Sequence, residues 1–262
     1  MTDNLTSTLR LADTEVPRIG LGTNRLTNTS EHVALIREAV AAGIRHVDTA
    51  HLYTGGESER VIGAAISPGE EGTVVATKGG YQPGEGEPSV LSAQIAESLR
   101  RLGTDSIALY YLHRVDPQTP LEASLATIAE HRDSGVIRHV GLSEVSVEQI
   151  ERARELVPIA AVQSHFNISE RKHEQVVDYC TREGIVFVPF YPLRGGAGPA
   201  AAEIAARHQA TERQIALAWL LRRSPLILPI PGTLSLDHVR DNLAALQIEL
   251  TDDEFDDLSR AA

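Results

Sequence analysis

Short apolar runs alternate along the chain with longer segments in which apolar residues recur every three or four positions. Runs of Val, Ile and Leu predict β-strands, and the three-to-four spacing predicts amphipathic helices. Most of the runs are continuously apolar, which is typical of parallel strands covered on both faces. The eight predicted strands are Arg18–Thr23, Ile44–Asp48, Thr73–Lys78, Ile107–His113, Ile137–Ser143, Ala161–His165, Ile185–Phe190 and Leu226–Ile230.

The segments between the strands carry the helical spacing, and several of them end at a glycine that directly precedes a strand. Gly43, Gly103 and Gly184 are examples. Glycine readily adopts the left-handed conformation that closes a helix, so these positions predict helix ends. The predicted helices are Ser30–Ala42, Ser58–Ala65, Ser89–Leu102, Pro120–Ser134, Val147–Val157, Glu170–Glu183, Ala200–His208, Thr211–Arg223, Leu236–Ala245 and Asp252–Arg260.

Eight strands that alternate with helices predict a closed barrel. The chain has 262 residues, close to the roughly 250 residues typical of a (β/α)8 barrel. No linker or change of composition divides the chain. We therefore predict an α/β fold, a single-domain (β/α)8 TIM barrel over residues 1–262. The segment Thr8–Val16, with a turn at Asp13–Thr14, is expected to form a β-hairpin that covers the bottom of the barrel.

The charge balance and the cysteine content narrow the choice of partners and compartments. The chain has 24 Lys and Arg against 36 Asp and Glu, a formal net charge of −12, which disfavours binding to nucleic-acid phosphates. Its one cysteine, Cys180, excludes an intrachain disulfide, fits a reducing compartment and is expected to be buried. Residues 1–30 lack a signal-peptide pattern, and no apolar stretch approaches the ~18 residues of a membrane span. We expect a cytoplasmic protein that binds neither nucleic acid nor membrane; its oligomeric state stays open.

Polar and ionisable residues close several of the predicted strands. Asp48, Lys78 and His113 end three successive strands, and Tyr53 lies in the loop that follows the first of them. Taken singly, the aspartate would be a turn cap, the lysine a solvated side chain and the histidine a structural residue. Catalytic groups of α/β barrels gather at the C-terminal ends of the strands, so the four residues together predict an active site.

These four side chains form a chemically sensible set. A free phenol has a pKa of about 10, and we expect the Lys78 ammonium to lower the pKa of Tyr53. Asp48 would hold Lys78 in place as an ion-pair partner, and His113 would orient a substrate oxygen. The set would therefore protonate an oxygen that gains negative charge. Hydride transfer to a carbonyl group creates such an oxygen.

The residues around these positions resemble the motifs of the aldo-keto reductase family, in the family's order, from about residue 8 to residue 260. The matching stretches are Val47–Tyr53 with Gly55–Glu59, Ala76–Lys78, Tyr111–His113, Val140–Ser143, Val162–Gln163 with Phe166–Asn167, and Pro229–Thr233 with Asp241–Asn242. The resemblance implies reduction of aldehydes and ketones without a metal, with NADPH, less often NADH, extended across the barrel mouth. It also implies a catalytic tetrad of Asp48, Tyr53, Lys78 and His113.

The resemblance further implies which positions contact the cofactor. Ser143, Glu144 and Gln163 correspond to the residues that hold the nicotinamide carboxamide, and Phe190 to the ring that stacks on the nicotinamide. Gly22 and Thr23 correspond to residues that line the floor of the same nicotinamide site. The full implied set is Gly22, Thr23, Asp48, Ser143, Glu144, Gln163, Phe190, Pro192, Leu193, Gly232, Thr233, His238, Asp241 and Asn242.

Departures from the family pattern bear on cofactor choice. The family often has Asn in place of Glu144 and Tyr in place of Phe190. Many NADPH-dependent members hold the 2′-phosphate with a Lys and an Arg, where this chain has Gly232 and His238. NADP is favoured over NAD, with Thr233, Ser235 and Arg240 as further phosphate partners. The run Gly22–Leu26, with Pro231–Thr233 and His238, is similar to a bacterial branch linked to pyridoxal reduction, which makes pyridoxal a candidate substrate.

The sequence therefore predicts an NAD(P)H-dependent oxidoreductase that reduces the carbonyl group of small aldehydes or ketones. The alternative is a non-catalytic NADP-binding protein of the same fold with a regulatory or redox-sensing role. A barrel hydrolase would need acids at the ends of the fourth and seventh strands, which carry His113 and Phe190. The Gly20–Gly22 run lacks the third glycine of a Rossmann fingerprint. The 10 histidines show no H-x-H or H-E-x-x-H spacing, so no metal site is expected.

Overall fold

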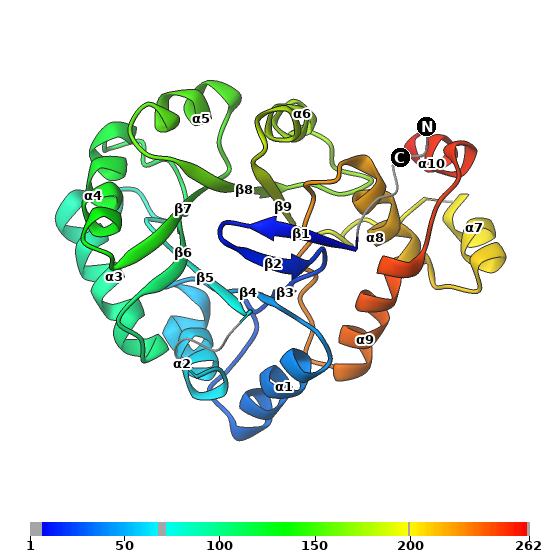
Figure 1. Ribbon diagram of the computed structural model, residues 1–262, viewed down its shortest axis with the longest axis horizontal. Helices are drawn as coiled ribbons and strands as arrows, with labels where there is room; N and C mark the ends of the chain where they lie inside the picture. Colours follow the sequence, from blue (N-terminus) through cyan, green and yellow to red (C-terminus); the bar gives the residue numbers. More distant parts are fainter. Residues whose placement is uncertain (1–6, 68–71, 199, 261–262) are drawn as a thin grey trace.

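The computed structural model describes residues 7–67, 72–198 and 200–260, and it shows a ring of parallel strands surrounded by helices (Figure 1). The strands are β1 (Thr8–Leu11), β2 (Thr14–Pro17), β3 (Leu21–Gly22), β4 (His46–Asp48), β5 (Val74–Gly79), β6 (Ile107–Leu112), β7 (Ile137–Ser143), β8 (Ile159–His165) and β9 (Val186–Phe190). The outermost residues of the expected domain, 1–6 and 261–262, lie outside the described residues.

Ten α-helices and two short 3-10 helices are present in the described part of the chain. They are α1 (Ser30–Ala41), η1 (Tyr53–Gly56), α2 (Glu57–Ala65), α3 (Pro88–Leu102), α4 (Leu121–Asp133), α5 (Val147–Arg154), α6 (Glu174–Glu183), α7 (Ala200–His208), α8 (Glu212–Arg223), α9 (Leu236–Ala244), η2 (Ala245–Gln247) and α10 (Asp252–Arg260). Gly103 and Gly184 adopt the left-handed cap conformation after α3 and α6, as the sequence predicts.

Strands β3 to β9 form one sheet in which each strand is the parallel neighbour of the next. The register pairs Asp48 with Ala76, Lys78 with Tyr111, and Ser143 with Gln163. Parallel strands in this register bring their C-terminal ends to the same rim of the ring. The predicted α/β barrel is confirmed.

The eighth predicted strand, Leu226–Ile230, does not form a regular strand. Pro229 and Pro231 have no N–H group to give to a strand ladder, which explains the irregularity. The segment still hydrogen-bonds to both neighbours, because its backbone donates to the carbonyl of Phe187 and accepts from the N–H of Gly20, each at 2.9 Å. The ring therefore closes through seven regular strands and one irregular segment.

A buried arginine helps to hold this irregular segment. Arg18 is 1% exposed, and its guanidinium donates to the carbonyls of Leu221 (2.7 Å), Ser224 and Ile227 (3.3 Å). Burial lowers the pKa of Arg18 to about 10. The sequence pattern predicts only the start of a strand at this position, because an isolated arginine before an apolar run carries no signal of burial.

The hairpin of β1 and β2 lies across the middle of the ring in Figure 1. Leu9, Leu11 and Val16 pack in one apolar cluster with barrel side chains that include Val74 and Val186. Because these two valines begin β5 and β9, the hairpin covers the N-terminal ends of the strands. The predicted cover at the bottom of the barrel is confirmed.

Some predicted boundaries were wrong. The hairpin turn is Ala12–Asp13 rather than Asp13–Thr14, because Leu11 pairs with Thr14. Helix α5 ends at Arg154 rather than at residue 157, where the following proline disfavours the helical conformation.

Helix α6 begins at Glu174 rather than Glu170, because a local turn replaces its predicted first residues. The Asn167 side-chain oxygen accepts hydrogen bonds from the backbone N–H groups of Ser169 and Glu170, each at 2.9 Å. Such side-chain hydrogen bonds compete with helix formation.

The structure bears on the expected burial of Cys180 and on the length of the apolar segments. Cys180 is fully buried, as expected, and burial raises the pKa of its thiol to about 12. Across the described ranges, every helix is too short or too polar to span a bilayer.

Candidate active site

A cavity of about 650 Å³ opens at the C-terminal ends of the barrel strands. This volume lies within the range of small-molecule sites. The cavity is lined by Gly22, Thr23, Asn24, Arg25, Asp48, Leu52, Tyr53, Thr54, Tyr81, His113, Arg114, Ser143, Gln163, Phe190, Tyr191, Ile230 and Gly232. Three of the four predicted catalytic residues are on this lining, and the fourth, Lys78, lies fully buried behind it.

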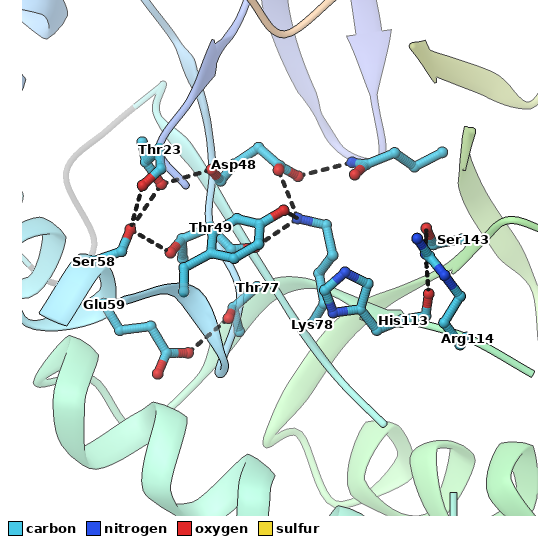
Figure 2. A network of polar contacts seen from close by, with 12 residues as sticks. Thr23, Asp48, Thr49, Ser58, Glu59, Thr77, Lys78, His113, Arg114 and Ser143 are labelled. Carbon is cyan, nitrogen blue, oxygen red and sulfur yellow. Dashed lines mark hydrogen bonds and ion pairs between the residues drawn. The ribbon is translucent and has the colours of Figure 1, made fainter. Parts of the chain in front are cut away.

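A buried ion pair forms the base of the cavity (Figure 2). Lys78 Nζ lies 2.6 Å from Asp48 Oδ1 and also donates to the carbonyl of Thr49 at 2.7 Å. Gln163 Nε2 donates to the other carboxylate oxygen of Asp48 at 2.8 Å. Burial by itself lowers the pKa of Lys78, but the neighbouring Asp48 and Tyr53 together hold it above its ordinary value. The lysine is therefore charged, as the sequence predicts.

Tyr53 is placed over this ion pair by the short helix η1. Its hydroxyl lies 3.4 Å from Lys78 Nζ, and the ammonium lies 5.0 Å from the centre of the ring. Burial raises the pKa of Tyr53 more than Lys78 lowers it, so the net shift is upward. The expectation of a lowered pKa was wrong, because the sequence does not show how deeply the phenol is buried. The phenol is firmly protonated, as a general acid must be.

A second buried ion pair supports the loop that carries Tyr53. Glu59 of α2 accepts from Thr77 Oγ1 at 2.7 Å and pairs with Arg101 of α3 at 3.1 Å. Arg101 also donates to the carbonyl of His51 at 2.8 Å. This network ties the loop after β4 to two helices. Sequence reasoning missed it, although Glu59 belongs to the stretch that carries the family resemblance.

His113 faces the cavity from the end of β6. Its ring centre lies 6.1 Å from that of Tyr53 and 4.8 Å from that of Tyr81. Burial, together with the positive charges of Lys78 and Arg114, lowers the pKa of His113 to about 2. Its Nδ1 is buried and has no hydrogen-bond partner in the described part of the chain. The ring is therefore neutral at physiological pH, a point that the sequence leaves open.

The structure brings six further predicted cofactor positions to the cavity, namely Gly22, Thr23, Ser143, Gln163, Phe190 and Gly232. Phe190 stacks on His165 with ring centres 5.6 Å apart and an interplanar angle of 14°. The backbone approaches closely at Gly22, where an added Cβ would lie 2.8 Å from the carbonyl oxygen of Ile230. These positions combine a flat aromatic ring with two glycines on the cavity lining, an arrangement suited to a planar ligand.

Glu144 does not point into the cavity. It has a left-handed backbone conformation (φ 56°), and its carboxylate accepts from the backbone N–H of His165 at 2.7 Å. The other carboxylate oxygen lies 3.6 Å from His173 Nε2. These contacts outweigh the effect of burial and lower the pKa of Glu144 to about 2. The predicted carboxamide contact does not fit this orientation, because both oxygens face other partners.

The remaining predicted positions are not on the lining of the cavity. They are Pro192, Leu193, Thr233, His238, Asp241 and Asn242. Thr233 Oγ1 lies 3.2 Å from His238 Nδ1, and Ser235 caps the start of α9 between them. Thr233 and His238 therefore form one polar cluster at the N-terminus of α9.

Eight lining residues escaped the sequence reasoning, namely Asn24, Arg25, Leu52, Thr54, Tyr81, Arg114, Tyr191 and Ile230. Several of them directly follow a predicted site residue, and Asn24, Arg25, Leu52 and Ile230 lie within stretches that carry the family or branch resemblance. Among the described residues, no cluster of three His, Cys, Asp or Glu side chains is arranged to hold a metal ion.

Buried neutral histidines predict that the protein loses stability in mild acid. Burial lowers the pKa of His46, which is fully buried in β4, to about 4, and that of His113 to about 2. Between these values and the ordinary pKa of about 6.5, the unfolded chain binds protons that the folded chain excludes. The free energy of unfolding should therefore fall by roughly 2 kcal/mol per histidine between pH 7 and pH 5.

Urea unfolding at the two pH values measures this effect. His46→Leu should remove about half of the pH dependence, whereas replacement of the exposed His238 by Asn should leave it unchanged. Equal stability of the unmodified protein at pH 7 and pH 5 would contradict the account.

Comparison with known proteins identifies the class that this fold and site define. A model of the aldo/keto reductase family matches residues 18–262. The chain therefore belongs to the aldo-keto reductase family and is an oxidoreductase of that family.

Two curated relatives cover almost the whole chain. An uncharacterized oxidoreductase of Schizosaccharomyces pombe is 37% identical over 95% of this chain and 87% of its own length. The pyridoxine 4-dehydrogenase of Escherichia coli is 35% identical over 94% of this chain and 95% of its own length.

Solved structures agree with the fold, and one of them contains NADPH. A thermostable aldo-keto reductase in complex with the inhibitor epalrestat has a TM-score of 0.89 and 31% identity, covering 98% of this chain and 100% of its own. An aldo-keto reductase from Klebsiella pneumoniae in complex with NADPH has a TM-score of 0.87 and 28% identity, covering 97% and 94%.

Proposed function

We propose that this chain reduces the carbonyl group of small aldehydes or ketones to alcohols, with NADPH as the hydride source and Tyr53 as the general acid. One observation carries the proposal. A protonated, buried phenol lies against the Lys78–Asp48 ion pair on the wall of a cavity that it shares with neutral His113. This arrangement suits proton donation to an oxygen that gains charge.

Each of the four catalytic residues has its own role in the proposed reaction. The neutral ring of His113 has one N–H group, which orients the substrate oxygen by a hydrogen bond. As negative charge builds on that oxygen, Tyr53 Oη transfers its proton to it. The phenolate that remains is stabilised by the Lys78 ammonium, and Asp48 keeps that ammonium in place. The proton thus moves over a short path inside a site held by fixed charges.

NADPH, when bound, supplies the hydride, and the residues present fit this dinucleotide. The ring of Phe190 and the bare backbone at Gly22 and Gly232 give a planar floor. Thr233 and His238, at the N-terminus of α9, are suited to a phosphate group, because helix N-termini favour anions. We therefore propose NADP rather than NAD. We also propose cofactor contacts from Thr23, Asp48, Ser143, Gln163, Pro192, Leu193, Asp241 and Asn242.

Gly22→Ala should weaken NADPH binding about 10-fold. The new Cβ would lie 2.8 Å from the Ile230 carbonyl oxygen, so the backbone leading to Gly232 must move. That backbone forms part of the proposed cofactor floor. Titration of NADPH fluorescence gives the dissociation constant, and a value equal to that of the unmodified protein would argue against this floor.

Pyridoxal is the candidate substrate, because of the similarity to the pyridoxine 4-dehydrogenase of Escherichia coli. A panel of aldehydes that includes pyridoxal, assayed by the loss of NADPH absorbance, tests both the reaction and the substrate. We expect turnover with NADPH to exceed turnover with NADH. Binding of NADPH without turnover of any carbonyl compound would instead support a regulatory or redox-sensing role.

A further inference from the structure

The charge of the cavity lining is opposite to that of the whole protein. The chain has a formal net charge of −12, yet the charged residues on the lining are Asp48, Arg25 and Arg114. Asp48 is neutralised by its ion pair with Lys78, and His113 is neutral. Two guanidinium groups therefore set the charge of the cavity, which favours an anionic ligand.

The two arginines lie on different sides of the cavity. Arg25 follows β3, and its guanidinium donates to the carbonyl of Gly232 at 3.0 Å, beside the proposed cofactor floor. Arg114 directly follows His113, and its Nη1 donates to the His113 carbonyl at 2.7 Å and to Ser143 Oγ at 3.1 Å (Figure 2). Arg25 is thus placed to contact the cofactor, and Arg114 is placed to contact a substrate whose oxygen binds His113.

Asp116, two residues after Arg114 in the sequence, and Glu144, which feels the charge of Arg114, are both bound to other partners. Asp116 accepts from the backbone N–H groups of Gly84, Gly86 and Gln118, each within 3.0 Å. Glu144 accepts from the backbone of a neighbouring strand, as described above. Within the described ranges, no carboxylate lies within 4.0 Å of the Arg114 guanidinium. The charge of Arg114 contributes to the lowered pKa of Glu144, but no carboxylate pairs with the guanidinium directly, so the guanidinium can bind an anionic ligand.

The position of Arg114 is also fixed in advance. The guanidinium lies 5.2 Å from the ring centre of Tyr81. The Tyr81 loop is held in turn by Glu85, whose carboxylate accepts from the N–H groups of Tyr81 and Gln82 at 3.0 Å. A guanidinium that is fixed by an aromatic ring and by two hydrogen bonds loses little entropy when it binds an anion.

We propose that Arg114 binds an anionic group of the substrate, so that the preferred substrates are small carbonyl compounds that carry a carboxylate or a phosphate. This inference rests on the proposed function and narrows its substrate class. Arg114 acts on specificity and takes no part in the proton transfer.

Matched pairs of substrates test the proposal. One pair is 4-carboxybenzaldehyde and its methyl ester; the other is pyridoxal 5′-phosphate and pyridoxal. We expect kcat/KM to be about 10- to 100-fold higher for the anionic member of at least one pair. The pair that shows the preference identifies the anion as carboxylate or phosphate. No preference in either pair would overturn the proposal.

Variants of Arg114 and Arg25 distinguish a role in substrate binding from a role in cofactor binding. Arg114→Gln should remove the preference, so that the ratio of kcat/KM between the anionic and the neutral member of the pair falls to about 1, and Arg114→Lys should retain part of the preference. Arg25→Gln should instead raise KM for NADPH and keep the preference. If Arg114→Gln weakens NADPH binding and slows both members equally, Arg114 serves the cofactor and the proposal is wrong.

An equilibrium measurement adds a readout that is independent of turnover. Calorimetric binding of 4-carboxybenzaldehyde to the NADP-loaded Tyr53→Phe protein should weaken about 10-fold or more when Arg114→Gln is added. Failure of the proposed function itself would look different, since no carbonyl compound, charged or neutral, would then be turned over.

Discussion

Tyr53→Phe should lower kcat for carbonyl reduction by about 10²- to 10⁴-fold, the usual contribution of a positioned general acid. The substitution removes only the hydroxyl that lies 3.4 Å from Lys78, and the ring keeps its place against the ammonium. NADPH binding should therefore change little. Steady-state kinetics with one aldehyde and a fluorescence titration with NADPH measure the two effects separately.

A matched control is available elsewhere in the barrel. Tyr179→Phe also removes a buried phenol hydroxyl, one that accepts a hydrogen bond from Arg154 at 2.8 Å outside the cavity. This variant should keep kcat close to that of the unmodified protein. An equal loss in the two variants would mean that the effect is structural.

Lys78→Met should destabilise the protein by about 3–5 kcal/mol as well as abolish most of the activity. Both partners of the Lys78–Asp48 pair are almost completely buried, so the substitution leaves Asp48 as an uncompensated buried charge. Among the residues that the structure describes, Gln163 alone then still donates a hydrogen bond to the Asp48 side chain. Urea unfolding of the variant measures the loss.

The double variant Asp48→Asn, Lys78→Met distinguishes this explanation from a simple packing defect. It removes both charges, so most of the lost stability should return, while the activity stays low. A loss below about 1 kcal/mol for Lys78→Met alone would show that the pair is worth no more than a surface ion pair.

The sequence predicted the position of the catalytic residues because strand ends follow from simple periodicity. Asp48, Lys78 and His113 come at the ends of apolar runs, and parallel strands bring such ends to one rim. The same reasoning failed for Leu226–Ile230, which is apolar enough for a strand but contains Pro229 and is followed by Pro231. The two prolines lack the backbone N–H group that a strand ladder needs, but this lack does not change the pattern of apolar residues along the sequence.

The main feature that the sequence did not predict is the direction in which the side chains of the site point. Glu144 follows a strand like the other site residues, but its left-handed backbone turns the carboxylate toward His165 and His173. Arg114 and Tyr81 come from different loops, and their contact exists only after folding. The pKa of Tyr53 depends on depth of burial, which no local pattern reports.

The protonation states of the site predict a simple pH profile for carbonyl reduction. His113, with a pKa of about 2, adds no break near neutral pH. Because burial holds the pKa of Tyr53 above its ordinary value of about 10, the acid form persists through the neutral and mildly alkaline range. The reduction rate of the folded protein should therefore be flat around neutral pH and fall only in strongly alkaline solution, as the phenol loses its proton.

The rate of hydride transfer in a single turnover tests the proposed role of Tyr53 most directly. The unmodified protein and Tyr53→Phe are each loaded with NADPH and mixed with excess aldehyde, and NADPH oxidation is followed at neutral pH. The account predicts a rate about 10²- to 10⁴-fold lower for Tyr53→Phe at equal NADPH occupancy. An unchanged single-turnover rate would contradict the account.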